Sequence, residues 1–178
     1  MARGLLLLDV DGPLNPYAAN KTRRPPGYTT YRRTATGWHT GRDARRFRGM
    51  RVWLNPCHGA QLLALAEETG LTLVWATTWQ HEANDRIGPA VGLPRLPVVE
   101  FPGLTTSGWD EEWKWPAVAD YAAGRPLAWL DDEHDRTGAE EFTRRRAGAP
   151  TLLCHVDPRQ GLGPAHLAQV RDWAGSLA

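Results

Sequence analysis

The sequence lacks the hydrophobic runs that mark membrane proteins. None approaches the roughly 20 apolar residues that a membrane-spanning helix needs. The opening Met-Ala-Arg-Gly and the four leucines after it are too short for the hydrophobic region of a signal peptide. We therefore expect a cytoplasmic protein with no membrane partner, and nothing in the sequence indicates an obligate protein partner.

Cysteine is scarce, with only Cys57 and Cys154, each followed by histidine. The two Cys-His pairs lack the close Cys-x-x-Cys spacing of most zinc sites. Adjacent residues on a strand also point to opposite faces, which makes it hard for one pair to hold a single ion. Buried free thiols are therefore favoured over a zinc site.

Acidic residues are nearly absent from one segment. Between Lys21 and Arg51, ten Lys or Arg accompany a single acid, Asp43. That segment carries a charge of +9, which leaves −8 on the rest of a chain whose net charge is +1. A basic segment beside an acidic body indicates an anionic partner, although a solvated surface is the ordinary alternative.

Short apolar runs alternate with helical segments along the chain. The predicted strands are residues 4–10, 71–76, 97–101, 127–130 and 151–155. Such alternation is typical of a parallel sheet covered by helices on both faces. It predicts an α/β fold, a three-layer Rossmann-like sandwich with a central parallel sheet of about five strands.

Residues 13–51 interrupt this alternation. They are rich in Gly, Pro, Thr and Arg, they carry Tyr28, Tyr31 and Trp38, and they show no helical period. A short strand at residues 29–31 and a hairpin near residues 36–37 are expected. Because long loops inside compact domains commonly serve as lids or binding loops, we interpret residues 13–51 as a small basic flap, or minimal cap. It would be inserted after the first strand of a single domain, residues 1–178.

Two carboxylates end the first predicted strand. Asp9 and Asp11 follow four leucines, precede Gly12, and share one face of an extended chain because they are two residues apart. The carboxyl ends of parallel strands are where open α/β sheets build their sites. Burying two carboxylates is costly unless a cation or a substrate group compensates. The pattern predicts a divalent-metal site, and a strand end capped by a polar turn is the simpler alternative.

Other polar residues stand at the ends of later elements. Thr77 follows the second strand, Lys114 precedes a helix, and the pair Asp131-Asp132 ends the fourth strand. In a doubly wound sheet these ends lie along one edge and can converge. Together they offer oxygens for a hard cation, a hydroxyl and a positive charge for phosphate. The simpler alternatives are a strand-end hydroxyl, a lysine stacked on a neighbouring indole, and solvated turn acids.

In order and spacing, these residues resemble the four motifs of the haloacid dehalogenase (HAD) superfamily of phosphohydrolases. The first motif resembles residues 7–12, Leu-Leu-Asp-Val-Asp-Gly, and the second resembles the apolar strand ending in Thr77. The third resembles Lys114, and the fourth resembles Leu130-Asp131-Asp132. The resemblance extends over about residues 5–135 and implies the Rossmann-like fold of that superfamily.

A narrower resemblance involves three short segments. Leu54-Asn55-Pro56, residues 75–79 (Trp-Ala-Thr-Thr-Trp) and Glu82-Ala83-Asn84 are similar to the HAD domains of bacterial RNA-repair (Swiss Army Knife) proteins. One departure from the superfamily pattern is Pro13, where Thr or Val is common. Proline removes a backbone N–H and restricts the turn, but it replaces no proposed catalytic side chain.

The resemblance implies a Mg²⁺-dependent phosphatase. Asp9 would attack phosphorus and form an aspartyl-phosphate, and Asp11 would act as general acid and then as general base. Asp9, the backbone carbonyl of Asp11 and the acidic pair would form the metal site. Within the pair we expect Asp132 to be the direct ligand and Asp131 to orient Lys114 or a bound water.

The substrate would be a phosphate monoester, either a phosphorylated small molecule, such as a nucleotide, or a nucleic-acid end. Thr77 and Lys114 would bind the transferring phosphoryl group. The other substrate-binding candidates are Thr78, Arg45 and Arg46. Arginines and aromatic residues of the flap suit phosphates and bases.

Two alternatives remain at this stage. The first is a non-catalytic phosphate-binding or nucleic-acid-binding module on the same fold, which the loss of Asp9 or Asp11 would have favoured. The second is a phosphoacceptor domain of the receiver type. Receivers carry their acid pair on the first strand and the acceptor Asp mid-chain, the reverse of the order here.

Overall fold

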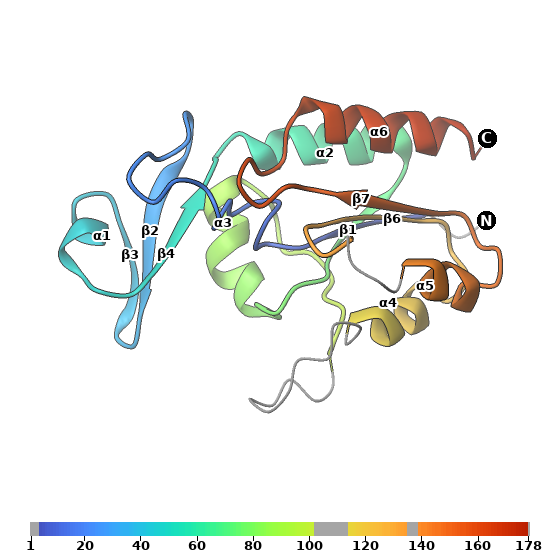
Figure 1. Ribbon diagram of the computed structural model, residues 1–178, viewed down its shortest axis with the longest axis horizontal. Coiled ribbons are helices and arrows are strands. Elements are labelled where there is room, and N and C mark those ends of the chain that lie inside the picture. Colours follow the sequence, from blue (N-terminus) through green and yellow to red (C-terminus); the bar gives the residue numbers. More distant parts are fainter. Residues whose placement is uncertain (1–3, 102–113, 135–138, 178) are drawn as a thin grey trace.

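The computed structural model describes residues 4–101, 114–134 and 139–177. Within them, a central sheet has four parallel strands: β1 (Leu5–Leu8), β5 (Thr72–Trp75), β6 (Leu127–Asp131) and β7 (Thr151–His155). Their order is β5-β1-β6-β7 (Figure 1). β1 is paired on both sides, since Leu5 lies opposite Thr72 and opposite Leu127. This central position explains the unbroken leucine run, because both faces of the strand are buried.

The fifth expected strand, residues 97–101, is present only as an isolated pairing beside β5. The backbone N–H of Trp75 donates to the Pro97 carbonyl at 2.9 Å, and the Val99 N–H donates to the Trp75 carbonyl at 2.8 Å. Pro97 has no N–H to donate, which limits the pairing that this segment can form. The expected sheet is thus confirmed with four regular strands in the described residues and a short paired segment at its β5 edge.

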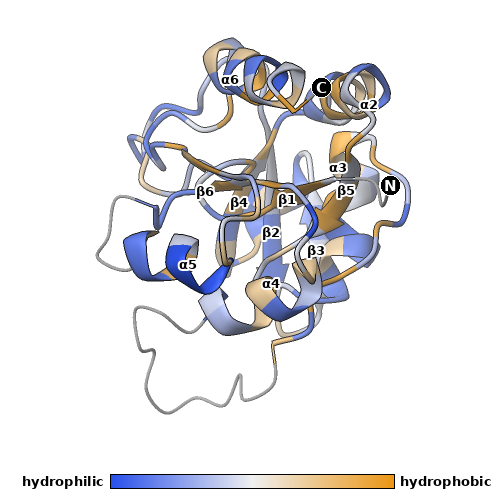
Figure 2. Ribbon diagram, turned by 90° about the vertical axis from the view of Figure 1, so that its right-hand side faces the viewer, coloured by the Kyte–Doolittle hydropathy of each residue, from blue (hydrophilic) through white to orange (hydrophobic). Residues whose placement is uncertain are grey.

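Helices cover both faces of the sheet, as the alternation predicted. On one face lie α2 (His58–Thr69) and α6 (Pro164–Gly175), and on the other lie α4 (Lys114–Ala122) and α5 (Ala139–Arg145) (Figure 1). The alternating side chains of β1 divide between two hydrophobic clusters. Leu6 and Leu8 belong with residues of α2 and α6, whereas Leu5 and Leu7 belong with residues of α4 and α5. Figure 2 shows the hydrophobic strands between these two helical layers.

The segment after β1 forms a second, smaller sheet in the described part of the chain. It consists of β2 (Thr29–Thr34), β3 (Gly37–Thr40) and β4 (Met50–Leu54), in the antiparallel order β3-β2-β4. The short helix α1 (Asp43–Arg46) joins β3 to β4. The strand expected at residues 29–31 is longer than predicted, and a hairpin does close between Thr34 and Gly37. This small sheet lies beyond the carboxyl end of β1 (Figure 1).

A π-helical turn, η1 (Ala83–Ile87), and the short helix α3 (Gly88–Val91) follow β5. Both cysteines carry free thiols; Cys154 is buried, but Cys57 is exposed, so the expectation of a buried thiol was wrong for Cys57. As for the membrane, the helices of the described ranges include none with both the length and the hydrophobicity needed to cross one.

Candidate active site

Asp9 and Asp11 lie in the turn that follows β1. The Asp9 backbone N–H donates to the Leu130 carbonyl at 3.0 Å, which continues the pairing of β1 with β6. Gly12 then adopts a φ of 89°, and a Cβ at this position would lie 2.6 Å from the side chain of Asp132. Glycine is therefore required both for the backbone conformation and for the close approach to Asp132.

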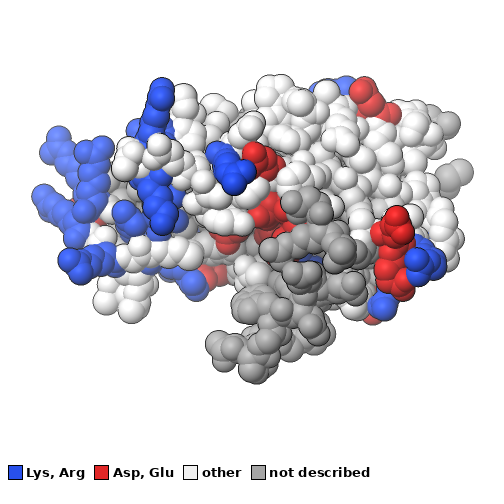
Figure 3. Space-filling view, in the orientation of Figure 1, with Lys and Arg blue, Asp and Glu red and all other residues white. Residues whose placement is uncertain are grey.

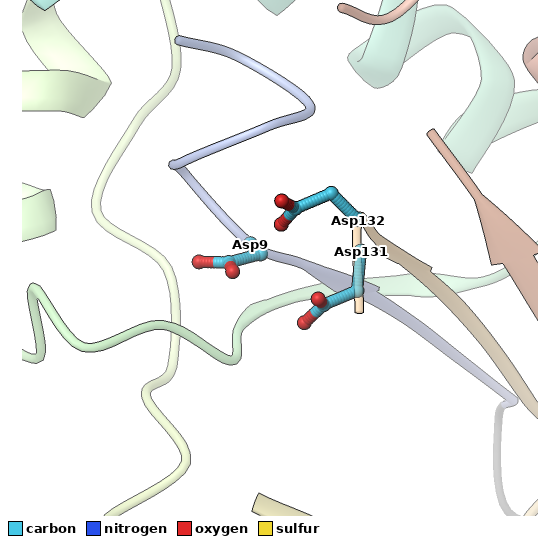
Figure 4. A group of neighbouring side chains, drawn as sticks. All are labelled: Asp9, Asp131 and Asp132. Atoms are coloured by element: carbon cyan, nitrogen blue, oxygen red, sulfur yellow. The ribbon is translucent and has the colours of Figure 1, made fainter. Parts of the chain in front are cut away.

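Three carboxylates meet where β1 and β6 end (Figure 4). Asp9, Asp131 and Asp132 each place an oxygen within 4.8 Å of the others. Asp9 and Asp131 are buried and Asp132 is half-buried. Hard oxygen donors in such a group are the ligands that Mg²⁺ prefers, so the donor set fits a hard divalent cation.

Lys114, the first residue of α4, lies among these carboxylates. Its Nζ is 2.7 Å from Asp9 Oδ2, 2.8 Å from Asp131 Oδ2 and 3.2 Å from Glu133 Oε2. Burial lowers the pKa of Lys114, but these three carboxylates outweigh burial and raise the pKa well above its usual value. The lysine is therefore charged. It neutralises only part of the acidic charge around it, and a further cation would compensate the rest.

Asp11 is held by two side-chain donors. Asn15 Nδ2 donates to Asp11 Oδ1 at 2.7 Å, and the indole Nε1 of Trp79 donates to Asp11 Oδ2 at 2.9 Å. Burial, followed by repulsion from Asp9, raises the pKa of Asp11, and the two hydrogen bonds oppose that rise. A carboxyl whose proton is held more tightly than usual suits proton transfer near neutral pH.

Asp132 accepts a hydrogen bond from the segment between β1 and β2. The Tyr17 hydroxyl donates to Asp132 Oδ2 at 2.8 Å. Burial raises the pKa of Asp132 to about 6, although the hydrogen bond from Tyr17 counteracts part of this effect. In turn, burial and the neighbouring Asp132 raise the pKa of Tyr17 above its ordinary value, so the phenol stays protonated and able to donate.

A cavity of about 360 Å³ opens over these groups. Asp9, Asp11, Lys114, Asp132 and Thr78 line it. The structure thus brings together three of the four predicted acids, the lysine and one of the two predicted threonines at a single cavity, with Asp131 buried behind them in contact with Lys114.

Three other predicted site residues, Thr77, Arg45 and Arg46, do not line this cavity. Thr77 is buried just beyond β5, where its Oγ1 accepts a long hydrogen bond of 3.4 Å from the Trp79 backbone N–H. Arg45 and Arg46 lie exposed on α1, and neither is among the described residues that line the site cavity. Arg46 instead faces Asp43 at 3.8 Å.

Five residues of this site were missed by sequence reasoning: Asn15, Tyr17, Arg51, Trp79 and Glu133. Each lies close in sequence to a recognised motif or at the end of the basic flap, and that proximity was the only available signal. Glu133, for example, directly follows the acidic pair. Their roles as donors or as partners of Lys114 depend on which side chains meet in space.

The chain is similar to a known protein family over most of its length. A family described as the HAD domain in Swiss Army Knife RNA repair proteins matches residues 5–167. No curated protein and no solved structure matches the chain. The matched range includes β1, β5, β6 and β7, and with them every carboxylate of the cluster and Lys114.

Proposed function

The chain belongs to the HAD domains of Swiss Army Knife RNA repair proteins, and we propose that it is a Mg²⁺-dependent phosphatase that hydrolyses a phosphate monoester, such as that of a nucleotide or nucleic-acid end. One observation carries the proposal. Asp9, Lys114, Asp131 and Asp132 come from segments far apart in the sequence, yet their charged atoms surround one point at the mouth of a cavity.

The carboxylate cluster would hold the metal ion. Asp131 already uses both oxygens, because Oδ2 accepts from Lys114 and Oδ1 accepts from the Glu133 backbone N–H at 2.9 Å. Among the described contacts, Asp132 accepts a hydrogen bond only at Oδ2, from Tyr17, which supports Asp132 as the direct ligand of the acidic pair and Asp131 as the residue that orients the lysine. Asp9, although it too accepts at both oxygens, and the Asp11 backbone carbonyl would complete the ligand set. A bound Mg²⁺ would supply positive charge to the phosphoryl oxygens.

Asp9 would act as the nucleophile. Its Oδ2 accepts from Lys114 and its Oδ1 accepts from the Val10 N–H at 2.6 Å, contacts that orient the carboxylate. An Asp9 oxygen would form a bond to phosphorus while the bond from phosphorus to the leaving oxygen breaks. Lys114 would balance charge on the phosphoryl group, and the hydroxyl of Thr78, which lines the cavity, would donate to its oxygens.

Asp11 would move the proton in both halves of the reaction. It would give its proton to the leaving oxygen as the aspartyl-phosphate forms. It would then take a proton from the water that attacks phosphorus, which breaks the bond to Asp9 and releases inorganic phosphate. Asn15 and Trp79 would keep the carboxyl in place between the two steps.

The test is a phosphatase assay with Mg²⁺ on p-nitrophenyl phosphate and on nucleotides. Asp9→Asn should reduce turnover to background, because an amide cannot form the intermediate. Asp11→Asn should lower turnover by roughly 10²–10⁴-fold on an alkyl phosphate and by less on p-nitrophenyl phosphate, whose leaving group needs little protonation. Asp120→Asn, an exposed position on α4, is the matched control.

Wild-type turnover in Asp9→Asn would rule out the covalent mechanism. Phosphate binding without turnover in the wild-type protein would instead support a non-catalytic binding module on the same fold.

A further inference from the structure

Two larger cavities each share lining residues with the site cavity. One, of about 720 Å³, is lined by Arg33, Trp38, Arg48, Glu82 and Arg86, and it shares Met50 with the site cavity. We call it the small-sheet groove. The other, of about 590 Å³, shares Tyr17, Asp132 and Glu133 with the site and extends to Asp157 and Arg159 near the end of β7. We call it the β7 cavity. Either has room for the part of a substrate that lies beyond its phosphate.

The position of Asp11 distinguishes the two cavities. A general acid must lie within hydrogen-bond reach of the leaving oxygen, so the alcohol part of the ester departs past Asp11. Asp11 accepts a hydrogen bond from Trp79. Trp38 of the small-sheet groove packs edge-on against Trp79, with 6.1 Å between ring centroids. One indole therefore connects Asp11 to Trp38 of the groove. Asp11 itself lines neither cavity, and the β7 cavity meets the site at Tyr17, Asp132 and Glu133.

The charges of the two cavities differ in sign. In the small-sheet groove, Arg33 and Glu82 neutralise each other in an ion pair, and Arg48 and Arg86 add two positive charges. In the β7 cavity, Asp132, Glu133 and Asp157 outnumber Arg159. Figure 3 shows the same division on one face of the molecule, with Lys and Arg gathered over the small sheet and acids nearer the middle. An anionic leaving group is attracted to the groove and repelled by the β7 cavity.

We propose that the alcohol part of the substrate is itself polyanionic: a nucleic-acid strand whose terminal phosphate enters the site and whose following phosphates lie in the small-sheet groove against Arg48 and Arg86. This rests on the proposed phosphatase function and specifies the path of its substrate. The groove is larger than a single phosphate requires, and exposed arginines beside aromatic residues are typical of surfaces that follow a single strand.

The experiment compares KM and kcat for p-nitrophenyl phosphate, a mononucleotide, and short oligonucleotides phosphorylated at the 3′ or the 5′ end. The double variant Arg48→Gln/Arg86→Gln should raise KM for an oligonucleotide on the order of tenfold and leave p-nitrophenyl phosphate turnover unchanged. The salt dependence of oligonucleotide KM should weaken by a logarithmic slope of about 0.7 for each phosphate contact removed.

Two matched controls locate the effect. Arg145→Gln changes an exposed arginine on α5, remote from the groove (Figure 1), and should leave every KM unchanged. Arg159→Gln changes the β7 cavity and should leave oligonucleotide KM unchanged or lower. Equal KM for oligonucleotide and mononucleotide, or a rise in KM with Arg159→Gln but not with the double variant, would overturn the proposed path. A protein that turns over none of the esters would instead overturn the phosphatase function itself.

Discussion

At the scale of single residues, the site is a concentration of negative charge around one buried lysine. Lys114 contacts Asp9 and Asp131 at hydrogen-bond distance and Glu133 at 3.2 Å. Burial makes each ionised carboxylate costly, and repulsion from Asp9 adds to that cost for Asp11, Asp131 and Asp132. The folded state therefore accepts electrostatic strain at the place where a cation and a phosphate would bind.

Asp132→Asn should stabilise the metal-free protein at neutral pH. Burial raises the pKa of Asp132 to about 6, above the usual 3.8, so the folded state binds its proton more tightly than the unfolded state does. The free energy of unfolding therefore falls as pH rises from about 3.8 to about 6, and at higher pH the full destabilisation by the ionised Asp132 is present. Because the side chain is partly exposed, we expect a gain in Tm of only about 2–4 °C at neutral pH.

Thermal unfolding in a chelator, followed near pH 4 and near pH 7, measures this effect. The difference between variant and wild type should be much smaller at the lower pH, where Asp132 is protonated in the folded state and only partly ionised in the unfolded state. A difference that is equal at both pH values would show that ionisation of Asp132 is not its cause.

At the scale of elements, glycines determine how closely neighbouring segments approach. Gly70 ends α2 in the left-handed conformation, which glycine adopts without steric cost. Gly59 lies inside α2 where the backbone of α3 crosses it, and a Cβ there would lie 2.2 Å from the Val91 carbonyl oxygen. This contact anchors the segment that carries Arg86 to the helix that follows β4.

Gly59→Ala should destabilise the fold by about 1–3 kcal/mol, because a backbone carbonyl cannot move aside as a flexible side chain can. Alanine's better helix propensity offsets only part of this loss. Gly175→Ala, at the end of α6 with nothing within 4 Å of its Cβ position, is the control and should be neutral or slightly stabilising. Denaturant unfolding measures both variants, and equal free energies of unfolding would contradict the close packing of α2 on α3.

At the scale of the whole molecule, charge is divided between two parts. The segment from Lys21 to Arg51 carries +9 against −8 elsewhere, and most of it folds into the small sheet and α1. The acidic cluster lies at the junction of the two parts, where the main sheet ends. In the proposed function, a substrate that is anionic along its length would be drawn to the basic part, and a cation at the acidic cluster would bind its terminal phosphate.

Mg²⁺ should stabilise the entire fold, because the carboxylates that would bind it are assembled only in the folded chain. At a concentration about 100 times its Kd, the ion should add about 2.7 kcal/mol, which corresponds to a rise in Tm of about 5–10 °C. Asp9→Asn should lose most of this rise, and Asp120→Asn should keep it. An unchanged Tm at saturating Mg²⁺ would argue against a metal site at these residues.

Much of the fold could be predicted because its signals are local. A run of four leucines indicates a strand buried on both faces, and the alternation of strands and helices indicates a parallel sheet. The fifth strand, predicted at residues 97–101, forms only an isolated pairing with β5, because Pro97 has no N–H to donate. The small sheet was predicted only as a short strand and a hairpin, since pairing of β2 with β4 depends on residues distant in sequence.

The sequence by itself determined which chemical groups stand at the ends of the strands. A strand buried on both faces must end where its polar residues begin, so the positions of Asp9, Asp11, Asp131 and Asp132 follow from hydrophobicity alone. Only the tertiary structure decided what each group contacts: Trp79 and Asn15 with Asp11, Tyr17 with Asp132, and Glu133 with Lys114. The physical reason is that hydrogen bonds and ion pairs depend on distances of a few ångströms, which chain spacing does not specify.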